Sequence, residues 1–163
     1  MSSKAAPLDT AEIESHLAEL RRAYVEALPK QRLSVAVQRI KNPHHDPNLL
    51  IAYVAAVEGF ARSLCLHQRG RTKEELSAAY PEYERRGAQS LVGEYLAAKA
   101  LPPPRDHFGA ETWDRFGYAV EYRNLLAHEC TYLGQDRSPG LIDACRKVLQ
   151  TLANDAGLSA DDI

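Results

Sequence analysis

Residues 47–68, PNLLIAYVAAVEGFARSLCLHQ, are the most apolar part of the chain and decide its fold class. Pro47 suits the first turn of a helix, and apolar residues then occupy most sides of the predicted helix. Arg69-Gly70-Arg71 ends the segment. Because a helix that is apolar on most sides must be covered by its neighbours, we expect it to be the central helix of the domain.

Other helix-forming segments precede and follow this one. Asp9-Thr10 offers a cap for a helix that runs roughly to Ala27. After Pro29, Leu33, Val37 and Ile40 continue a second amphipathic helix or a kinked extension of the first, until KNPHHDPN (41–48) breaks it. Thr72-Lys73-Glu74-Glu75 reads as a capping box that opens another helix. Residues 77–100 favour helix but are interrupted by Pro81 and two glycines, which predicts two short helices there.

The last third of the chain alternates between breakers and helices. LPPPRDHFG (101–109) predicts a stiff polyproline-like spacer, and residues 110–129 predict a long amphipathic helix. GQDRSPG (134–140) predicts a turn, and residues 141–156 a last helix.

The chain is expected to form a single all-α domain, a bundle of about five to seven helices. Its 163 residues, 45% hydrophobic and 26% charged, suit one core of ordinary size, and no strand-like alternation stands out. We expect residues 1–8 to be a disordered lead, residues 9–157 the bundle, and residues 158–163 a C-terminal tail.

Composition narrows the function classes. A net charge of −2 excludes a strongly basic nucleic-acid coat, although it permits a small basic pocket for one phosphate. The first residues, MSSKAAPLDTAEIE, contain no apolar signal segment, and we expect no run long enough to span a bilayer. Cys65, Cys130 and Cys145 are an odd number at no metal-like spacing, which predicts reduced thiols in a cytoplasmic protein.

The stretch EYRNLLAHE, residues 121–129, places three polar groups where an apolar stripe would continue. Asn124 and His128 are four residues apart and therefore lie on one helix face. Arg123 lies about 140° around the helix axis from His128, at 100° per residue, but its long side chain can reach back. A guanidinium fork, an amide and an imidazole are groups suited to holding and transforming a phosphate.

The pattern of arginine, four residues, histidine occurs three times in the chain. Arg39 to His44 straddles a proline, so we expect a solvated loop. Arg62 to His67 ends the apolar helix, where Arg62 is expected to extend into solvent and His67 to cap the last carbonyls. Only the third occurrence has an asparagine directly after the arginine.

Arg123-Asn124-Leu125-Leu126-Ala127-His128 resembles the RNxxxH form of the signature of HEPN domains, small all-α bundles found in RNA-cleaving toxins, antiviral effectors and RNA-processing proteins. Those domains place the motif in a late helix, as here. They commonly carry an acidic residue in an earlier apolar helix, and Glu58 occupies such a place.

The resemblance implies a metal-independent endoribonuclease that leaves 2′,3′-cyclic phosphate and 5′-hydroxyl ends. It implies catalytic roles for Arg123, Asn124 and His128, with Glu58 either positioning Arg123 or serving as a plain counter-ion. It further implies a homodimer whose two motifs share one cleft, an RNA substrate, a toxin or phage-defence role, and an antitoxin or regulatory partner. No metal, cofactor or membrane is expected.

Some features of the sequence favour other interpretations. Toxin members of the family often carry a tyrosine two residues after the histidine, but Cys130 stands there and the nearest tyrosine is Tyr132. His44-His45-Asp46 could bind a metal, although we expect a solvated loop, and a thiol nucleophile at Cys130 lacks an oxyanion-forming turn. A positive track could extend the site through Arg69, Arg71, Arg85, Arg86 and Arg105.

Two functional alternatives remain open. One is a non-catalytic HEPN-like module that binds RNA or a protein partner. The other is a helical scaffold in which Arg123, Asn124 and Glu58 form a buried polar network that fixes helix register.

Overall fold

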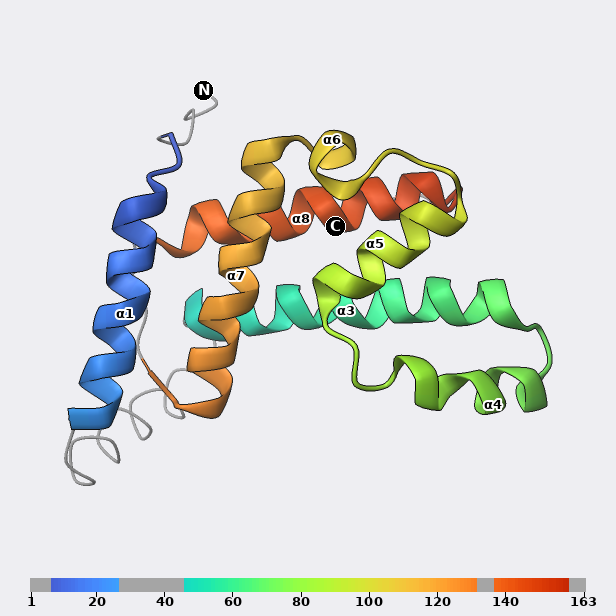
Figure 1. The fold of residues 1–163 in the computed structure, drawn as a ribbon, viewed down its shortest axis with the longest axis horizontal. Coiled ribbons are helices and arrows are strands. Elements are labelled where there is room, and N and C mark those ends of the chain that lie inside the picture. The colour runs from blue at the N-terminus through green and yellow to red at the C-terminus, as the bar shows by residue number, and fades with distance from the viewer. Residues whose placement is uncertain (1–6, 27–45, 132–136, 159–163) are drawn as a thin grey trace.

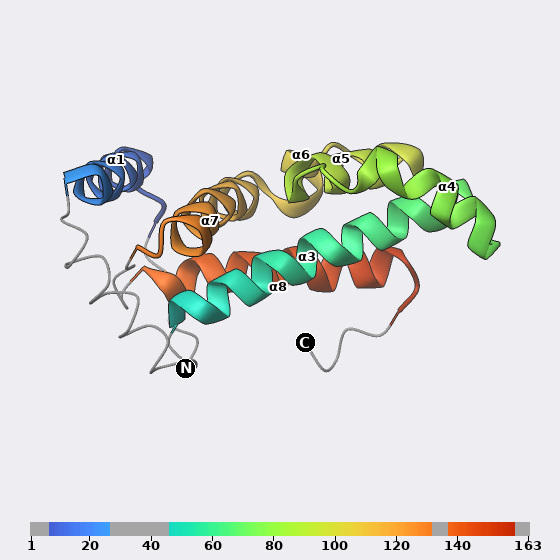
Figure 2. The ribbon, with the colours of Figure 1, turned by 90° about the horizontal axis from the view of Figure 1, so that it is seen from below.

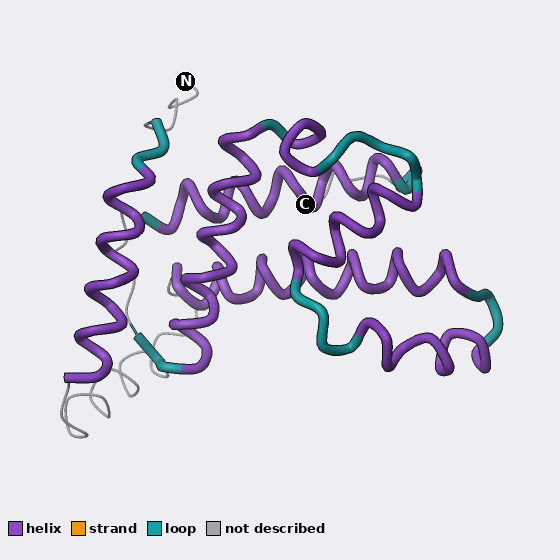
Figure 3. Tube along the Cα trace, viewed as in Figure 1, coloured by secondary structure: helices purple, strands orange, loops and turns teal. Residues whose placement is uncertain are grey.

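A computed structural model describes residues 7–26, 46–131 and 137–158 of the chain. Within these residues all regular structure is helical (Figure 3), so the all-α prediction is confirmed. The helices are α1 (Thr10–Glu26), α3 (Asp46–Arg69), α4 (Lys73–Tyr83), α5 (Ala88–Ala98), α6 (Pro104–Phe108), α7 (Ala110–His128) and α8 (Ser138–Asp155).

The helices form two layers (Figures 1 and 2). α3 and α8 lie side by side in one layer, and α7, α6 and α5 follow one another across the other. α1 packs beside α7 at one end of the molecule, and α4 folds back along α3 at the opposite end. The C-terminal half of α7 crosses the N-terminal half of α3 (Figure 1), and the two helices are in contact.

α3 is the central helix, as its apolar sequence predicted. Leu50, Val54, Val57, Ala61 and Cys65 recur every three or four residues and are fully buried or nearly so. The helix packs against α4, α5, α7 and α8. Burying an aliphatic side chain of this kind stabilises the fold by about 1.5–3 kcal/mol, so this stripe anchors both layers.

The helices that face α3 bury matching stripes. α7 buries Phe116, Ala119, Tyr122 and Leu126, at helical spacing, while Trp113 and Val120 are partly buried beside them. α8 buries a stripe of its own, made of Leu141, Ala144, Cys145, Val148 and Leu152. Each of these two helices therefore buries one face, as the amphipathic pattern of residues 110–129 predicted for α7.

The predicted spacer at residues 101–109 is wrong in its second half. Pro104–Phe108 forms the short helix α6, whose first residue is a proline with the fixed φ that a first helical turn accepts. Phe108 is buried, and its ring stacks on that of Trp113 with centroids 5.6 Å apart. His107 Nε2 lies 2.7 Å from Asp155 Oδ2, and this contact attaches α6 to the C-terminal end of α8.

Helix boundaries differ from the predictions at two prolines that were expected to lie outside or to interrupt a helix. α8 begins at Ser138 instead of residue 141, because Pro139 occupies its first turn. α4 includes Pro81 and ends two residues later at Tyr83. The capping box of α4 is confirmed, since the Thr72 side chain accepts from the Glu75 N–H and the Glu75 carboxylate accepts from the Thr72 N–H.

Some predictions fall on residues outside the described ranges. These include the helical segment after Pro29, the loop holding His44 and His45, residues 134–136 of the predicted turn, residues 1–6 of the expected lead, and residues 159–163 of the expected tail.

Residues Asn48–Arg69 form one helix that is long and apolar enough to cross a bilayer, by length and composition only. This corrects the expectation that the chain has no such run. The central helix of a water-soluble domain passes the same test, so this measure does not place the chain in a membrane.

Candidate functional site

The candidate site lies where the middle of α3 meets the last two turns of α7. Arg123 extends from α7 toward α3, and its Nη2 donates to Glu58 Oε2 at 3.0 Å. Both side chains are mostly buried, with 18% of the Arg123 side chain and 20% of the Glu58 side chain exposed. The structure thus brings together the arginine of the motif and the acidic residue of the earlier apolar helix.

The other oxygen of Glu58 is bound by a second arginine. Arg62, one turn further along α3, donates from its Nη2 to Glu58 Oε1 at 2.9 Å. Burial disfavours the negative charge of the carboxylate, but the hydrogen bonds and positive charges of Arg62 and Arg123 outweigh burial and lower the pKa of Glu58. Glu58 is therefore ionised at neutral pH and shared between two guanidiniums.

Asn124 completes the hold on Arg123. Its Oδ1 accepts a hydrogen bond of 3.0 Å from Arg123 Nε, while the Asn124 side chain itself remains exposed. Within the described residues, Arg123 Nη1 makes no hydrogen bond or ion pair. The guanidinium is thus fixed at two points and keeps N–H groups for a further acceptor.

His128 is the last residue of α7 and is exposed. α7 ends there because the chain turns at Cys130, which has the left-handed φ of 50°, and the Thr131 N–H reaches back 3.5 Å to the Leu125 carbonyl. Asn124 and His128, four residues apart on α7, are both exposed, whereas Arg123 is turned toward α3. The scaffold alternative predicted that Arg123, Asn124 and Glu58 are all buried. Arg123 and Glu58 are mostly buried, but Asn124 is exposed.

Arg62 is the residue of this cluster that the sequence interpretation missed. It was expected to extend into solvent, but only 17% of its side chain is exposed. The available signal was its position four residues after Glu58 on a predicted helix, a spacing at which opposite charges pair.

Most of the five arginines that could extend the site are paired with carboxylates. Arg71 has no ion pair with a described residue, but the other four arginines are paired with carboxylates, which offsets their charge: Arg69 with Glu82, Arg85 with Glu84, Arg86 with Glu94, and Arg105 with Asp114.

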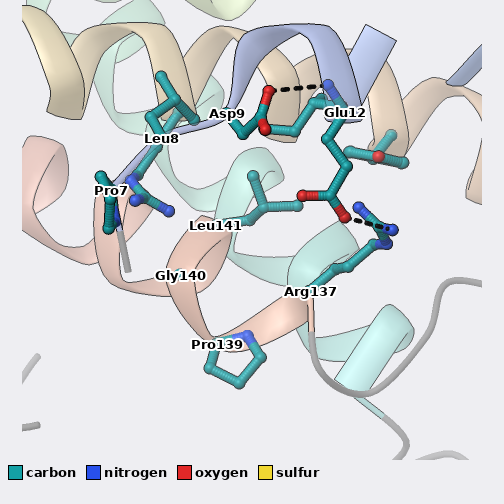
Figure 4. Close-up of a pocket in the computed structure, with 11 residues that line it drawn as sticks. Pro7, Leu8, Asp9, Glu12, Arg137, Pro139, Gly140 and Leu141 are labelled. Atoms are coloured by element: carbon teal, nitrogen blue, oxygen red, sulfur yellow. Dashed lines mark hydrogen bonds and ion pairs between the residues drawn. The ribbon is translucent and has the colours of Figure 1, made fainter. Parts of the chain in front are cut away.

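A separate pocket of about 380 Å³ lies on the far side of α7, between the N-terminal ends of α1 and α8 (Figure 4). Arg137 stands at its edge with Nη2 at 2.9 Å from Glu12 Oε1, so the charges there are largely matched. Tyr122 lines the pocket and pairs with His16 at 2.7 Å between its hydroxyl and Nδ1. Tyr122 and Arg123 are thus adjacent in sequence but contact different helices: Tyr122 bonds to His16 of α1 and Arg123 to Glu58 of α3.

Metal ligands do not cluster in the part of the chain that the structure describes. No group of three or more His, Cys, Asp or Glu side chains there could hold an ion. His44 and His45 lie outside those ranges. Cys65 and Cys145 are buried free thiols, and Cys130 is a half-buried one.

No protein-family model matches the sequence, and no curated protein or solved structure matches the chain. The resemblance to HEPN domains therefore rests on the motif residues themselves and on the order of the helices.

Proposed function

We propose that the protein is a metal-independent endoribonuclease of the HEPN type, in which Arg123, Asn124 and His128 act on the RNA phosphate. The observation that supports this proposal is the hydrogen bonding of the Arg123 guanidinium. Its guanidinium is anchored by Glu58 and Asn124, while Nη1 is unpaired among the described residues. A fixed cation with unused N–H donors, beside an exposed amide and an exposed imidazole, suits a tetrahedral phosphate.

RNA can be cleaved without a metal through its own 2′-hydroxyl. The 2′-oxygen loses its proton to a base and attacks phosphorus, the bond from phosphorus to the 5′-oxygen breaks, and an acid supplies a proton to that oxygen. The products are a 2′,3′-cyclic phosphate and a 5′-hydroxyl. Arg123 would stabilise the negative charge that builds on the non-bridging oxygens, and His128 would transfer a proton.

One imidazole cannot easily serve both sides of the phosphorus at once. The proposal therefore includes a homodimer in which His128 of each protomer faces one shared cleft. His128 is exposed at the end of α7, where a second protomer can approach it. A toxin or phage-defence role, with an antitoxin or regulatory partner, belongs to the same proposal and rests on the resemblance alone.

The test is cleavage of RNA in the presence of EDTA by the wild-type protein and by the variants His128→Ala and Arg123→Ala. The chain supplies a matched control in His67→Ala, because His67 is also an exposed histidine in the last turn of a helix and also follows an arginine by five positions. We expect cyclic phosphate ends from the wild type and from His67→Ala, and a loss of at least about 100-fold in His128→Ala.

Other outcomes would overturn the proposal in distinct ways. RNA binding without cleavage by the wild type would identify a non-catalytic RNA-binding module. Cleavage that survives in His128→Ala would show that other residues, or a contaminant, perform the chemistry. Cleavage abolished by EDTA would replace the metal-free mechanism with a metal-dependent one.

A further inference from the structure

We propose that Arg62 is a positioning residue that keeps one edge of the Arg123 guanidinium available for the phosphate. This inference rests on the proposed function, because it assigns Arg62 a role in the same site. Arg62 does not act on the phosphate in this scheme. It acts through Glu58, by controlling how many carboxylate oxygens Arg123 can engage.

The geometry divides the Glu58 carboxylate between two arginines. Oε1 accepts from Arg62 at 2.9 Å, and Oε2 accepts from Arg123 at 3.0 Å. An arginine and a carboxylate commonly pair through two parallel hydrogen bonds, which use two N–H groups of the guanidinium. Because Arg62 holds Oε1, Arg123 is attached to Glu58 through Nη2 alone, and Nη1 is not drawn into the pair.

Arg62 is itself fixed by the turn that joins α4 to α5. Its Nε donates to the Tyr83 carbonyl at 3.1 Å, and its Nη2 donates to the Arg86 carbonyl at 3.2 Å. Tyr83 is the last residue of α4, where carbonyls have no partner within the helix. The guanidinium of Arg62 therefore cannot swing away from Glu58 without releasing two backbone acceptors.

Removing Arg62 would leave Glu58 Oε1 without its donor, so Arg123 could form hydrogen bonds with both carboxylate oxygens. The two guanidinium nitrogens farthest from the chain would then be turned toward α3 and lost to a ligand. Arg62→Met keeps the length and most of the apolar contact of the side chain but removes its donors. We expect a fall in kcat/KM for RNA on the order of 10- to 100-fold, as for other misplaced catalytic groups.

Two further single variants show whether a fall in kcat/KM in Arg62→Met comes from the lost contact with Glu58. Arg62→Lys should retain most of the activity, since an ammonium can still occupy Oε1. Arg69→Met is the matched control, because Arg69 lies on the same helix and pairs with Glu82 of α4 at 3.1 Å, away from Glu58. We expect Arg69→Met to stay within about twofold of the wild type, as an exposed ion pair contributes little.

A double variant separates positioning from plain structural support. Glu58→Gln in the Arg62→Met background leaves one side-chain oxygen, so Arg123 can again be held at a single point. We expect this double variant to recover several-fold in kcat over Arg62→Met alone, a positive coupling between the two sites. If Arg62 only supports the fold, the double variant will be as impaired as Arg62→Met or worse.

A measurement that does not need cleavage keeps this inference distinct from the proposed function. The guanidinium signal of Arg123, assigned by its loss in Arg123→Lys, is followed by NMR while a 2′-deoxy dinucleotide, which has no 2′-hydroxyl, is added. We expect the signal to shift in the wild type and in Arg62→Lys, and not in Arg62→Met. Equal responses in the wild type and Arg62→Met would overturn the role of Arg62, whether or not the wild type cleaves RNA.

Circular dichroism establishes that each variant is folded before it is compared. Should Arg62→Met fail to fold, Arg62→Gln takes its place, because an amide N–H can still reach a carbonyl of the α4–α5 turn without offering a charge to Glu58. Wild-type activity and a wild-type NMR response in Arg62→Gln would then be the overturning result.

Discussion

Arg123 and Glu58 are 65 positions apart in the sequence, yet Arg123 Nη2 lies 3.0 Å from Glu58 Oε2. The pair joins the central helix α3 to the helix that carries Asn124 and His128. It is mostly shielded from water, so its attraction is less screened than that of a surface ion pair.

Glu58→Gln is expected to destabilise the fold by about 1–3 kcal/mol, because two mostly buried guanidiniums lose a charged acceptor. A glutamine also offers one oxygen where the two arginines need two. Urea unfolding followed by circular dichroism measures the loss. Glu82→Gln is the control, since Glu82 pairs with Arg69 while 41% of the Glu82 side chain is exposed, and it should change stability far less.

The contribution of Glu58 to stability depends on pH in a defined direction. Its pKa is lowered in the folded protein, so the stabilisation is present above the ordinary value of 4.5 and is lost as pH falls through the folded value. The difference in unfolding free energy between the wild type and Glu58→Gln should therefore be constant near neutrality and shrink below about pH 4.5. A difference that stayed constant down to pH 3 would contradict this assignment of the charge.

The three thiols should differ in reactivity. Burial raises the pKa of Cys65 to about 11 and that of Cys145 to about 12, and both side chains are inaccessible. At pH 8 a thiol of pKa 11 is ionised in only about one molecule in a thousand, and the thiolate is the reactive form. We expect a disulfide reagent such as Ellman's reagent to modify Cys130 in the native protein and all three cysteines in denaturant. Rapid native modification of a second thiol would show that the core opens readily.

Thr72→Ala is expected to lower the free energy of unfolding by about 1 kcal/mol, because the side chain caps the N-terminus of α4. The Thr72 Oγ1 accepts from the Glu75 N–H at 3.2 Å, a bond that alanine cannot replace. Ser77→Ala, at an exposed position within the same helix, is the comparison. The prediction is wrong if both substitutions have equal effects in urea unfolding.

The sequence predicted those parts of the fold that depend on local pattern. The apolar run of α3 and the Thr72 capping box each depend only on residues close together in the sequence, and both predictions are confirmed by the structure. The helix at Pro104–Phe108 was missed, because it depends on Phe108 packing against Trp113 and on the contact of His107 with Asp155, which no local pattern contains.

In the candidate site, too, the features that depend on local spacing were predicted, and those that depend on contacts distant in sequence were not. The spacing of Asn124 and His128 predicts a shared face of one helix, and both are exposed on α7. The pairing of Glu58 with Arg123 was suggested by a family resemblance, because nothing in the 64 residues between them specifies it. The role of Arg62 depends on carbonyls of Tyr83 and Arg86, groups that every residue carries and that a sequence therefore cannot single out.

The distance in sequence between α3 and α7 also bears on how the protein is made. The chain leaves the ribosome from its N-terminus, so Glu58 and Arg62 emerge well before Arg123. A chain synthesised only as far as residue 109 has no α7, and hence neither the guanidinium nor the imidazole of the motif. α8, which packs on both α3 and α7, arrives later still. The site is therefore completed only after α7 has been synthesised, and a chain terminated before residue 110 lacks it.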